Sequence, residues 1–170
     1  MELAAADRGD QDLLLDLLNT TPLVEGVPMD VLADPAQAPT WLHEHGVSEV
    51  ELDALVAARD LLQAVVRGTA AADTLGPLLR KAALRATATT AGLSWDLDVE
   101  DAERGAVRVV LAWDALRINS PGRLRTCANH ECRRFLIDRS KPNTARWCSM
   151  ATCGNRMKAR RHYERTKTTP

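Results

Sequence analysis

The chain has 170 residues, of which 45% are hydrophobic, 26% charged and only 4% aromatic. This composition is typical of a soluble globular protein with one or two modest domains, and it disfavours a disordered or membrane-spanning chain. The apolar run from Leu13 to Leu18 is interrupted by Asp16, and Met1-Glu2 opens the chain with an acidic residue. We therefore expect no signal peptide, no transmembrane helix, no membrane partner and a cytoplasmic location.

The formal net charge of −1 conceals two oppositely charged parts. Residues 1–120 contain 9 Lys and Arg against 20 Asp and Glu, a net charge of −11, whereas residues 121–170 contain 13 against 3, a net charge of +10. Ser120-Pro121-Gly122 is typical of a domain boundary. The sequence thus predicts a domain of residues 1–120 and a basic domain of residues 121–170 that meets a polyanion.

Helices are predicted for most of the first seventy residues. The leucines between residues 13 and 18 form a stripe of helical period, which Thr21-Pro22 ends. A Pro-rich irregular stretch follows, and a short helix runs from Trp41 to Gly46. Ser48-Glu49-Val50-Glu51 is a capping-box sequence that predicts the start of a longer helix ending at Gly68.

The rest of the first domain combines helical and strand patterns. Asp73 is a candidate cap for a helix reaching about Ala83, with Gly92 beyond its end. Residues 93–99 alternate between apolar and polar as in a short strand. Residues 107–118 fit a strand or a helix, and we favour a helix because Asp114-Ala115-Leu116-Arg117 does not suit a strand. The fold class expected is mainly α, with a short β element.

All four cysteines lie in the basic domain with the spacing C-x4-C-x15-C-x4-C: Cys127, Cys132, Cys148 and Cys153. In a reducing cytoplasm, two cysteine pairs a short loop apart predict one tetrahedral, structural Zn²⁺ ion per chain rather than disulfides. Redox-active or unliganded thiols are the alternatives. His130 could replace one cysteine as a ligand, although an exposed histidine in the loop is the simpler interpretation.

Between and after the cysteines, the pattern predicts a small zinc-dependent fold. Residues 135–137 are expected to form a strand, residues 141–143 a turn and residues 145–147 a return strand, and residues 154–166 a helix. A zinc-binding loop, a hairpin and a helix make a treble-clef-like arrangement. Because few apolar residues are present, metal binding must supply much of the folding free energy, on the order of 10 kcal/mol or more in zinc-dependent peptides.

Several of these segments resemble a known family. Asp138-Arg139-Ser140, Trp147-Cys148-Ser149-Met150 and Cys153-Gly154-Asn155-Arg156 resemble the bacterial CGNR zinc finger. Upstream, Asp16-Leu17-Leu18-Asn19-Thr20 and the Gly26, Asp30, Leu32, Pro35 and Trp41-Leu42 positions resemble the ABATE domain that accompanies this finger in stress-induced transcription regulators. The resemblance implies a zinc-bound, DNA-binding finger and a mostly helical regulatory domain.

The cations of the basic domain are the candidate nucleic-acid contacts. They cluster on the predicted last helix and just after the second cysteine: Arg156, Lys158, Arg160, Arg161, Arg165, Arg133 and Arg134. Such a helix fits the major groove of double-stranded DNA and neutralises phosphates there. The alternatives are an RNA-binding or protein-interaction module, and a solvated basic face that merely docks on the acidic domain. From the opposite charges we also expect the acidic domain to mask the basic helix in part, until an effector relieves the masking. A homodimer could present two fingers to two half-sites.

A weaker pattern lies in the first domain. Asn19, Thr20, Asp30 and Trp41 are expected either to form a capping network that anchors the Pro-rich stretch or to line a pocket for a small-molecule effector. We expect no enzymatic activity, because the chain has no phosphate-binding glycine loop and no nucleophile motif once the cysteines hold zinc.

Overall fold

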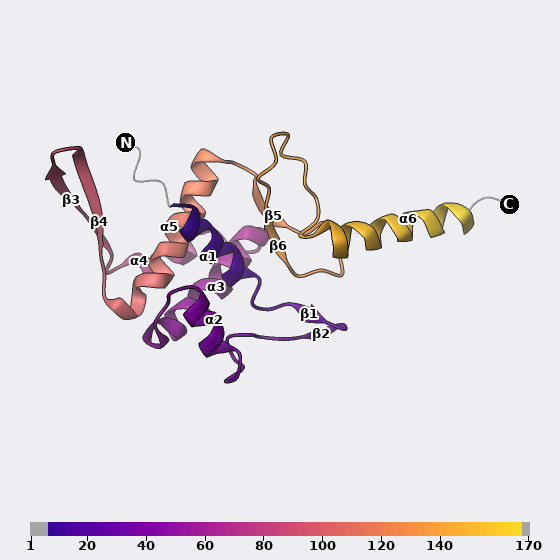
Figure 1. The fold of residues 1–170 in the computed structure, drawn as a ribbon, viewed down its shortest axis with the longest axis horizontal. Helices are drawn as coiled ribbons and strands as arrows, with labels where there is room; N and C mark the ends of the chain where they lie inside the picture. Colours follow the sequence, from indigo (N-terminus) through magenta and orange to yellow (C-terminus); the bar gives the residue numbers. More distant parts are fainter. Residues whose placement is uncertain (1–6, 168–170) are drawn as a thin grey trace.

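The computed structural model describes residues 7–167, without the side chains of Arg161, His162, Arg165 and Lys167. Helices dominate it (Figure 1). In chain order, the helices and strands are α1 (Arg8–Leu18), β1 (Leu23–Val24), β2 (Val27–Pro28), α2 (Ala38–Glu44), α3 (Leu52–Arg67), α4 (Gly76–Leu79), β3 (Ala83–Thr89), β4 (Gly92–Asp98), α5 (Arg104–Asn119), β5 (Leu124–Thr126), β6 (Phe135–Ile137) and α6 (Asn155–Lys167). Short helical turns are η1 (Glu49–Glu51), η2 (Ala72–Leu75), η3 (Asp101–Glu103) and η4 (Met150–Gly154).

The core of the helical domain lies where α1, α3 and α5 pack together. The predicted leucine stripe of α1 faces inward, since Leu14, Leu17 and Leu18 are almost fully buried. Residues 107–118 form the greater part of α5, which confirms the helical interpretation of that stretch. Mainly α is therefore the correct fold class.

The predicted capping box is present just before α3. The Ser48 side chain accepts a backbone hydrogen bond while Glu51 accepts one from the Ser48 N–H at 3.0 Å. Glu51 also accepts a 2.6 Å hydrogen bond from the N–H of Gly105 at the start of α5. One buried carboxylate thus fixes the beginnings of two core helices relative to each other. As predicted, α3 ends at Gly68, which has a φ of 74°.

The segment after Asp73 differs from the expected helix. Helical structure ends with the four-residue α4, and β3 begins at Ala83 and pairs antiparallel with β4 over seven residues. The predicted strand is confirmed as β4, but its partner was missed. Residues 83–89 read Ala-Leu-Arg-Ala-Thr-Ala-Thr, and the alanines favoured a helix locally whereas pairing with β4 favours the strand.

The hairpin of the C-terminal segment also differs in its pairing. β6 forms at residues 135–137 as predicted, but its partner is β5, before the first cysteine. Residues 145–147 are not a strand. Asp138 explains this, because its carboxylate accepts hydrogen bonds from the Ala145 N–H at 2.7 Å and from the Arg125 guanidinium at 2.6 Å. The returning chain is held by a side chain rather than by a strand ladder.

The two parts of the chain share one hydrophobic core. Phe135 of β6 is 1% exposed and belongs to the same cluster as the leucines of α1 and α3. Arg67 of α3 lies over the Phe135 ring, 4.6 Å from its centroid, and donates to the carbonyl of Arg133 at 3.2 Å. Within residues 7–167, no helix has the length and apolar character needed to cross a membrane.

Candidate metal centre and nucleic-acid interface

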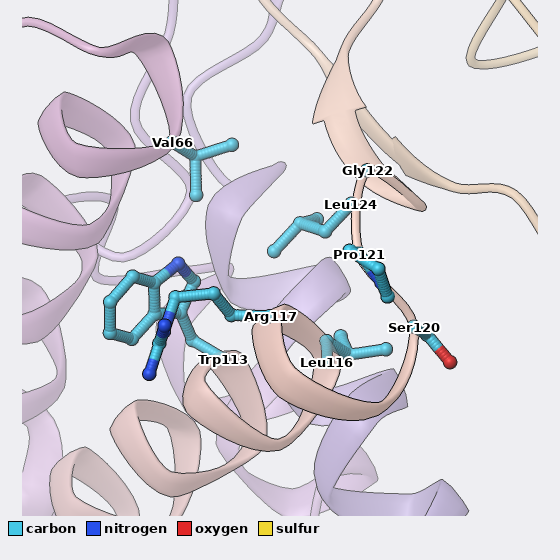
Figure 2. Close-up of a pocket in the computed structure, with 8 residues that line it drawn as sticks. All are labelled: Val66, Trp113, Leu116, Arg117, Ser120, Pro121, Gly122 and Leu124. Atoms are coloured by element: carbon cyan, nitrogen blue, oxygen red, sulfur yellow. The ribbon is translucent and has the colours of Figure 1, made fainter.

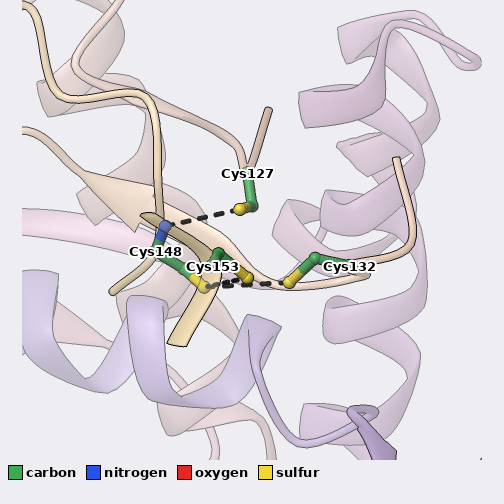
Figure 3. A group of neighbouring side chains, drawn as sticks. All are labelled: Cys127, Cys132, Cys148 and Cys153. Atoms are coloured by element: carbon green, nitrogen blue, oxygen red, sulfur yellow. Dashed lines mark hydrogen bonds between the residues drawn. The ribbon is translucent and has the colours of Figure 1, made fainter. Parts of the chain in front are cut away.

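The four cysteines converge on one point of the C-terminal segment (Figure 3). Their Sγ atoms all lie within 4.8 Å of one another. The Sγ–Sγ distances of Cys132 to Cys148 and of Cys148 to Cys153 are both 3.7 Å. All four are free thiols, and Cys127 and Cys153 are buried.

Asn129 shapes the loop that carries the first two cysteines. It is 1% exposed, its carbonyl accepts the N–H of Cys132 at 2.8 Å, and its side-chain oxygen accepts the N–H of Glu131 at 3.2 Å. Its side-chain amide points to the Sγ of Cys153 at 3.5 Å. Asn129 therefore folds the first loop and also contacts a cysteine of the second, a role that the sequence analysis missed.

The second pair of cysteines is positioned by the tight turn η4. The N–H groups of Cys153 and Gly154 both donate to the carbonyl of Ser149 at 3.0 Å. The N–H of Cys148 donates to the Sγ of Cys127 at 3.4 Å. Backbone donors aimed at sulfur favour the thiolate form, as in the surroundings of metal-bound cysteines.

The thiols influence one another's ionisation. Burial, followed by the neighbouring Cys132, raises the pKa of the Cys148 thiol, and burial also raises the pKa of Cys132. Burial alone would raise the pKa of Cys153 as well, but hydrogen bonds led by that of Asn129 outweigh it and lower the pKa. A divalent cation among the four sulfurs would stabilise all of them as thiolates.

The donor set fits a tetrahedral zinc ion. Four thiolates at the usual Zn–S distance define a tetrahedron whose edges are about 3.8 Å. The two Sγ–Sγ distances of 3.7 Å agree with that edge. Four sulfur ligands would leave no coordination position for water, which is typical of a structural rather than a catalytic site. His130 is exposed and lies outside the cysteine group.

The candidate DNA-contacting cations lie on the solvent side of this centre. Arg156, Lys158 and Arg160 are exposed on α6, and Arg133 and Arg134 are exposed just before β6. Arg160 also pairs with Glu131 at 3.2 Å, which ties α6 to the first loop. The side chains of Arg161 and Arg165 lie outside the described residues.

The expected masking of the basic helix is not the arrangement in the structure. α6 extends away from the helical domain (Figure 1). The acidic domain instead contacts the other side of the finger through α1 and α3, which meet β6 and β5. Apolar burial of Phe135, the hydrogen bonds of Asn19 to its backbone and an ion pair between Arg139 and Asp12 of α1 hold this docking together.

The four candidate effector-binding residues make structural contacts. The Asn19 side chain accepts from the N–H of Phe135 at 2.8 Å and donates to its carbonyl at 3.3 Å. Asp30 receives two hydrogen bonds from Arg59, at 2.6 and 2.9 Å, and Arg59 also donates to Thr20 at 3.2 Å. These contacts support the anchoring network, which for Asn19 extends to the finger.

Trp41 is the fourth candidate effector-binding residue. Trp41 is 9% exposed and stacks on His45, with ring centroids 4.1 Å apart. A cavity of about 170 Å³ lies elsewhere, at the junction of α3, α5 and β5 (Figure 2). It is lined by Val66, Trp113, Leu116, Arg117, Ser120, Pro121, Gly122 and Leu124. An effector bound at the four residues named above stays a prediction.

These features define a helical domain joined to a four-cysteine finger. The CGNR zinc finger model matches residues 123–166, and the ABATE model, described as "Putative stress-induced transcription regulator", matches residues 11–120. The chain therefore belongs to the ABATE family and carries a CGNR zinc finger. A search of the curated proteins gives no match.

Proposed function

We propose that the protein is a transcription regulator that binds double-stranded DNA through its C-terminal segment, with the helical domain modulating that binding. The observation that carries the proposal is the exposure of Arg156, Lys158 and Arg160 on a helix that extends from the cysteine centre into solvent (Figure 1). An α-helix of this kind fits the major groove. The family description supports a regulatory role.

We further propose that one structural Zn²⁺ ion per chain, held by the four cysteines, fixes α6 relative to the first loop. The Sγ geometry and the Asn129 contact to Cys153 support this assignment. Zinc with four thiolates carries a charge of about −2, which leaves the +10 segment at about +8. Phosphate attraction of this size gives sequence-independent affinity before any base is read.

The test is a salt titration of the zinc-loaded full chain with duplex DNA, a scrambled duplex and single-stranded RNA. The Arg156→Ala/Lys158→Ala double variant should reduce the slope of log affinity against log salt by about two on duplex DNA. Lys81→Ala is the matched control, because Lys81 is exposed, lies in the acidic domain and pairs with Glu100. Its slope should stay within error of the wild type.

The titration also separates the alternatives. Tighter binding to single-stranded RNA than to either duplex would favour an RNA-binding module. Absence of binding to all three nucleic acids at low salt would favour a protein-interaction module and contradict the proposal. A preference between the two duplexes would indicate base readout in addition to phosphate contacts.

A further inference from the structure

Arg67 ends α3 at the junction with the finger, and its side chain is held in place there. The guanidinium lies over the Phe135 ring, 4.6 Å from its centroid, and donates to the Gln63 side chain at 3.0 Å and to the Arg133 carbonyl at 3.2 Å. These two hydrogen bonds use two of the five N–H donors of a guanidinium. Arg67 is nevertheless an exposed residue. A fixed cation with further donors therefore lies at the surface.

Arg67 differs from most cations of the acidic domain in having no carboxylate partner. Arg59, Arg108 and Arg117 each pair with a carboxylate, at 2.6, 2.7 and 2.7 Å. Within residues 7–167, no Asp or Glu forms an ion pair with Arg67. Burial, and after it the like charge of Arg133, lower the pKa of Arg67. An anion shared by the two arginines would replace this repulsion with two favourable contacts.

The Arg67–Arg133 pair is continuous with the basic surface of the finger. Arg133 is exposed on the loop that follows the second cysteine. That loop contacts the end of α3 through the Arg133 carbonyl, and it contacts α6 through Glu131, which pairs with Arg160 at 3.2 Å. α3 also meets β5, on the side of the molecule from which α6 extends (Figure 1). Exposed cations thus run from the helical domain, across the loop, to α6.

We propose that Arg67 and Arg133 bind the phosphate backbone of DNA next to the groove that α6 enters, so that the helical domain makes a DNA contact of its own. This inference rests on the proposed DNA binding. The guanidinium group is suited to the site, because its planar fork matches phosphate oxygens. Phosphate contacts fix the orientation of a protein on the duplex but carry no base information. Arg67 therefore positions α6 rather than reading sequence.

The charge of the helical domain restricts this contact to one corner. Residues 1–120 carry a net charge of −11, so most of the domain repels DNA. A free phosphate ion would meet only the two arginines, whereas a duplex held by α6 meets them at a high effective concentration. Because Arg67 is held against Phe135 of the finger, the contact is available only while the two parts are docked.

The test is the salt titration of the zinc-loaded full chain on duplex DNA and on the scrambled duplex. Arg67→Gln should lower the slope of log affinity against log salt by about one, and affinity at about 0.1 M salt by up to about tenfold. Both duplexes should be affected equally, because phosphate contacts are independent of sequence. Arg80→Gln is the matched control, since Arg80 is exposed at the end of α4 and its replacement removes the same charge. Its slope should stay at the wild-type value.

Two further variants separate the phosphate contact from packing at the junction. Arg67→Lys keeps the charge but loses the fork that binds Gln63 and the Arg133 carbonyl, so it should retain the wild-type slope while lowering stability as Arg67→Gln does. Arg133→Gln should lower the slope by about one.

The outcomes distinguish this contact from DNA binding as such. With a wild type that binds DNA, an unchanged slope for Arg67→Gln or Arg133→Gln, an equal loss for Arg80→Gln, or a slope for Arg67→Lys as low as for Arg67→Gln would overturn the contact alone. An effect of Arg67→Gln on only one duplex would do the same. A wild type that binds neither duplex would overturn both this contact and the proposed function.

Discussion

Asn19 joins the helical domain to the finger through a single side chain. Its amide group accepts from the N–H and donates to the carbonyl of Phe135, so it satisfies both backbone groups of a buried residue. A primary amide offers an acceptor oxygen and a donor N–H on two neighbouring atoms, so one neutral side chain can bind both backbone groups of Phe135. The position after a helix suggested a local cap, but the partner lies 116 residues away in the chain.

Replacing this side chain should weaken the junction. Asn19→Ala leaves two half-buried backbone groups of Phe135 without partners, and we expect a loss of about 1–3 kcal/mol in the free energy of unfolding. Urea unfolding of the zinc-loaded protein followed by tryptophan fluorescence measures this loss. Asn119→Ala, at the exposed end of α5, is the control and should change stability by less than about 0.5 kcal/mol. Equal effects of the two variants would show that the junction does not depend on Asn19.

Asp30 gives the helical domain an acid-sensitive contact. Although burial alone would raise the pKa of Asp30, the hydrogen bonds and charge of Arg59 lower it below 3.8. A carboxylate with a depressed pKa stabilises the folded state above its unfolded pKa, and this stability is lost as the pH falls through the folded pKa. The contact should therefore contribute fully at neutral pH, begin to weaken near pH 3.8 and be lost as the pH falls through the lower folded pKa.

Asp30→Asn tests this pH dependence. At pH 7 we expect Asp30→Asn to lower the free energy of unfolding by about 2 kcal/mol. This loss is smaller than for a fully buried ion pair, because Arg59 retains Asp60 as a partner. The difference from the wild type should shrink as the pH falls below 3.8. Chemical unfolding monitored by helical circular dichroism measures it, with exposed Asp73→Asn as control. A difference that is independent of pH would contradict an ionic role for Asp30.

At the scale of elements, Gly105 controls how closely α5 approaches the start of α3. A Cβ at this position would lie 2.8 Å from the Glu51 Oε2 atom and 3.2 Å from the Leu55 Cδ2 atom. Gly105→Ala should therefore destabilise the protein by about 1–3 kcal/mol. In contrast, a Cβ at Gly76 meets nothing within 4 Å, so Gly76→Ala should be neutral or stabilising by up to about 1 kcal/mol. Thermal unfolding compares the two, and equal midpoints would exclude tight packing at Gly105.

The ion pair between the first loop and α6 should restrain DNA binding. Glu131 holds Arg160 at 3.2 Å and adds negative charge beside the proposed interface. Glu131→Gln removes this partner and leaves Arg160 only its longer contact with Glu164 at 3.8 Å, so DNA affinity should rise and the salt slope should steepen by up to about one. Glu103→Gln, in the distant η3, should leave both quantities unchanged. Weaker binding of Glu131→Gln would instead mean that the pair positions α6 for binding.

The accuracy of the sequence-based predictions follows the range of the interactions. The α1 stripe, the capping box at Ser48 and the convergence of the cysteines depend on local patterns, and the structure confirms them. β3 was missed although its partner β4 follows after two residues, because the alanines of residues 83–89 also suit a helix. The β5–β6 pairing could not be predicted, because it depends on Asp138, which holds residue 145 away from a strand. Asn129 and Asp138 were missed because their partners include side chains distant in sequence, although an Asn or Asp two residues before a turn is a recognisable signal.

At the scale of the whole molecule, the finger and the helical domain are coupled through Phe135. The ring is part of the core formed by α1 and α3, so an unfolded finger exposes apolar surface on both sides. Gln63 and Arg67 extend the coupling, because Gln63 binds the Leu18 carbonyl at 2.9 Å and accepts from Arg67 at 3.0 Å. The helical domain is therefore expected to be less stable when the finger lacks the proposed zinc ion.

Removal of zinc tests this coupling in the full chain. A chelator, or Cys148→Ser, should unfold the finger, retain most of the helical circular dichroism and lower the midpoint of helical unfolding. The loss of Phe135 from the core should cost the helical domain about 3 kcal/mol, by analogy with truncation of a buried Phe. In a domain of this size, that loss corresponds to a fall of roughly 10 °C in the unfolding midpoint. Asn19→Ala should lower the same midpoint with zinc bound but have little further effect without it, since the contact has already been lost. Equal midpoints with and without zinc would show that the two parts fold independently, and a chelated finger that stays folded would contradict the metal assignment itself.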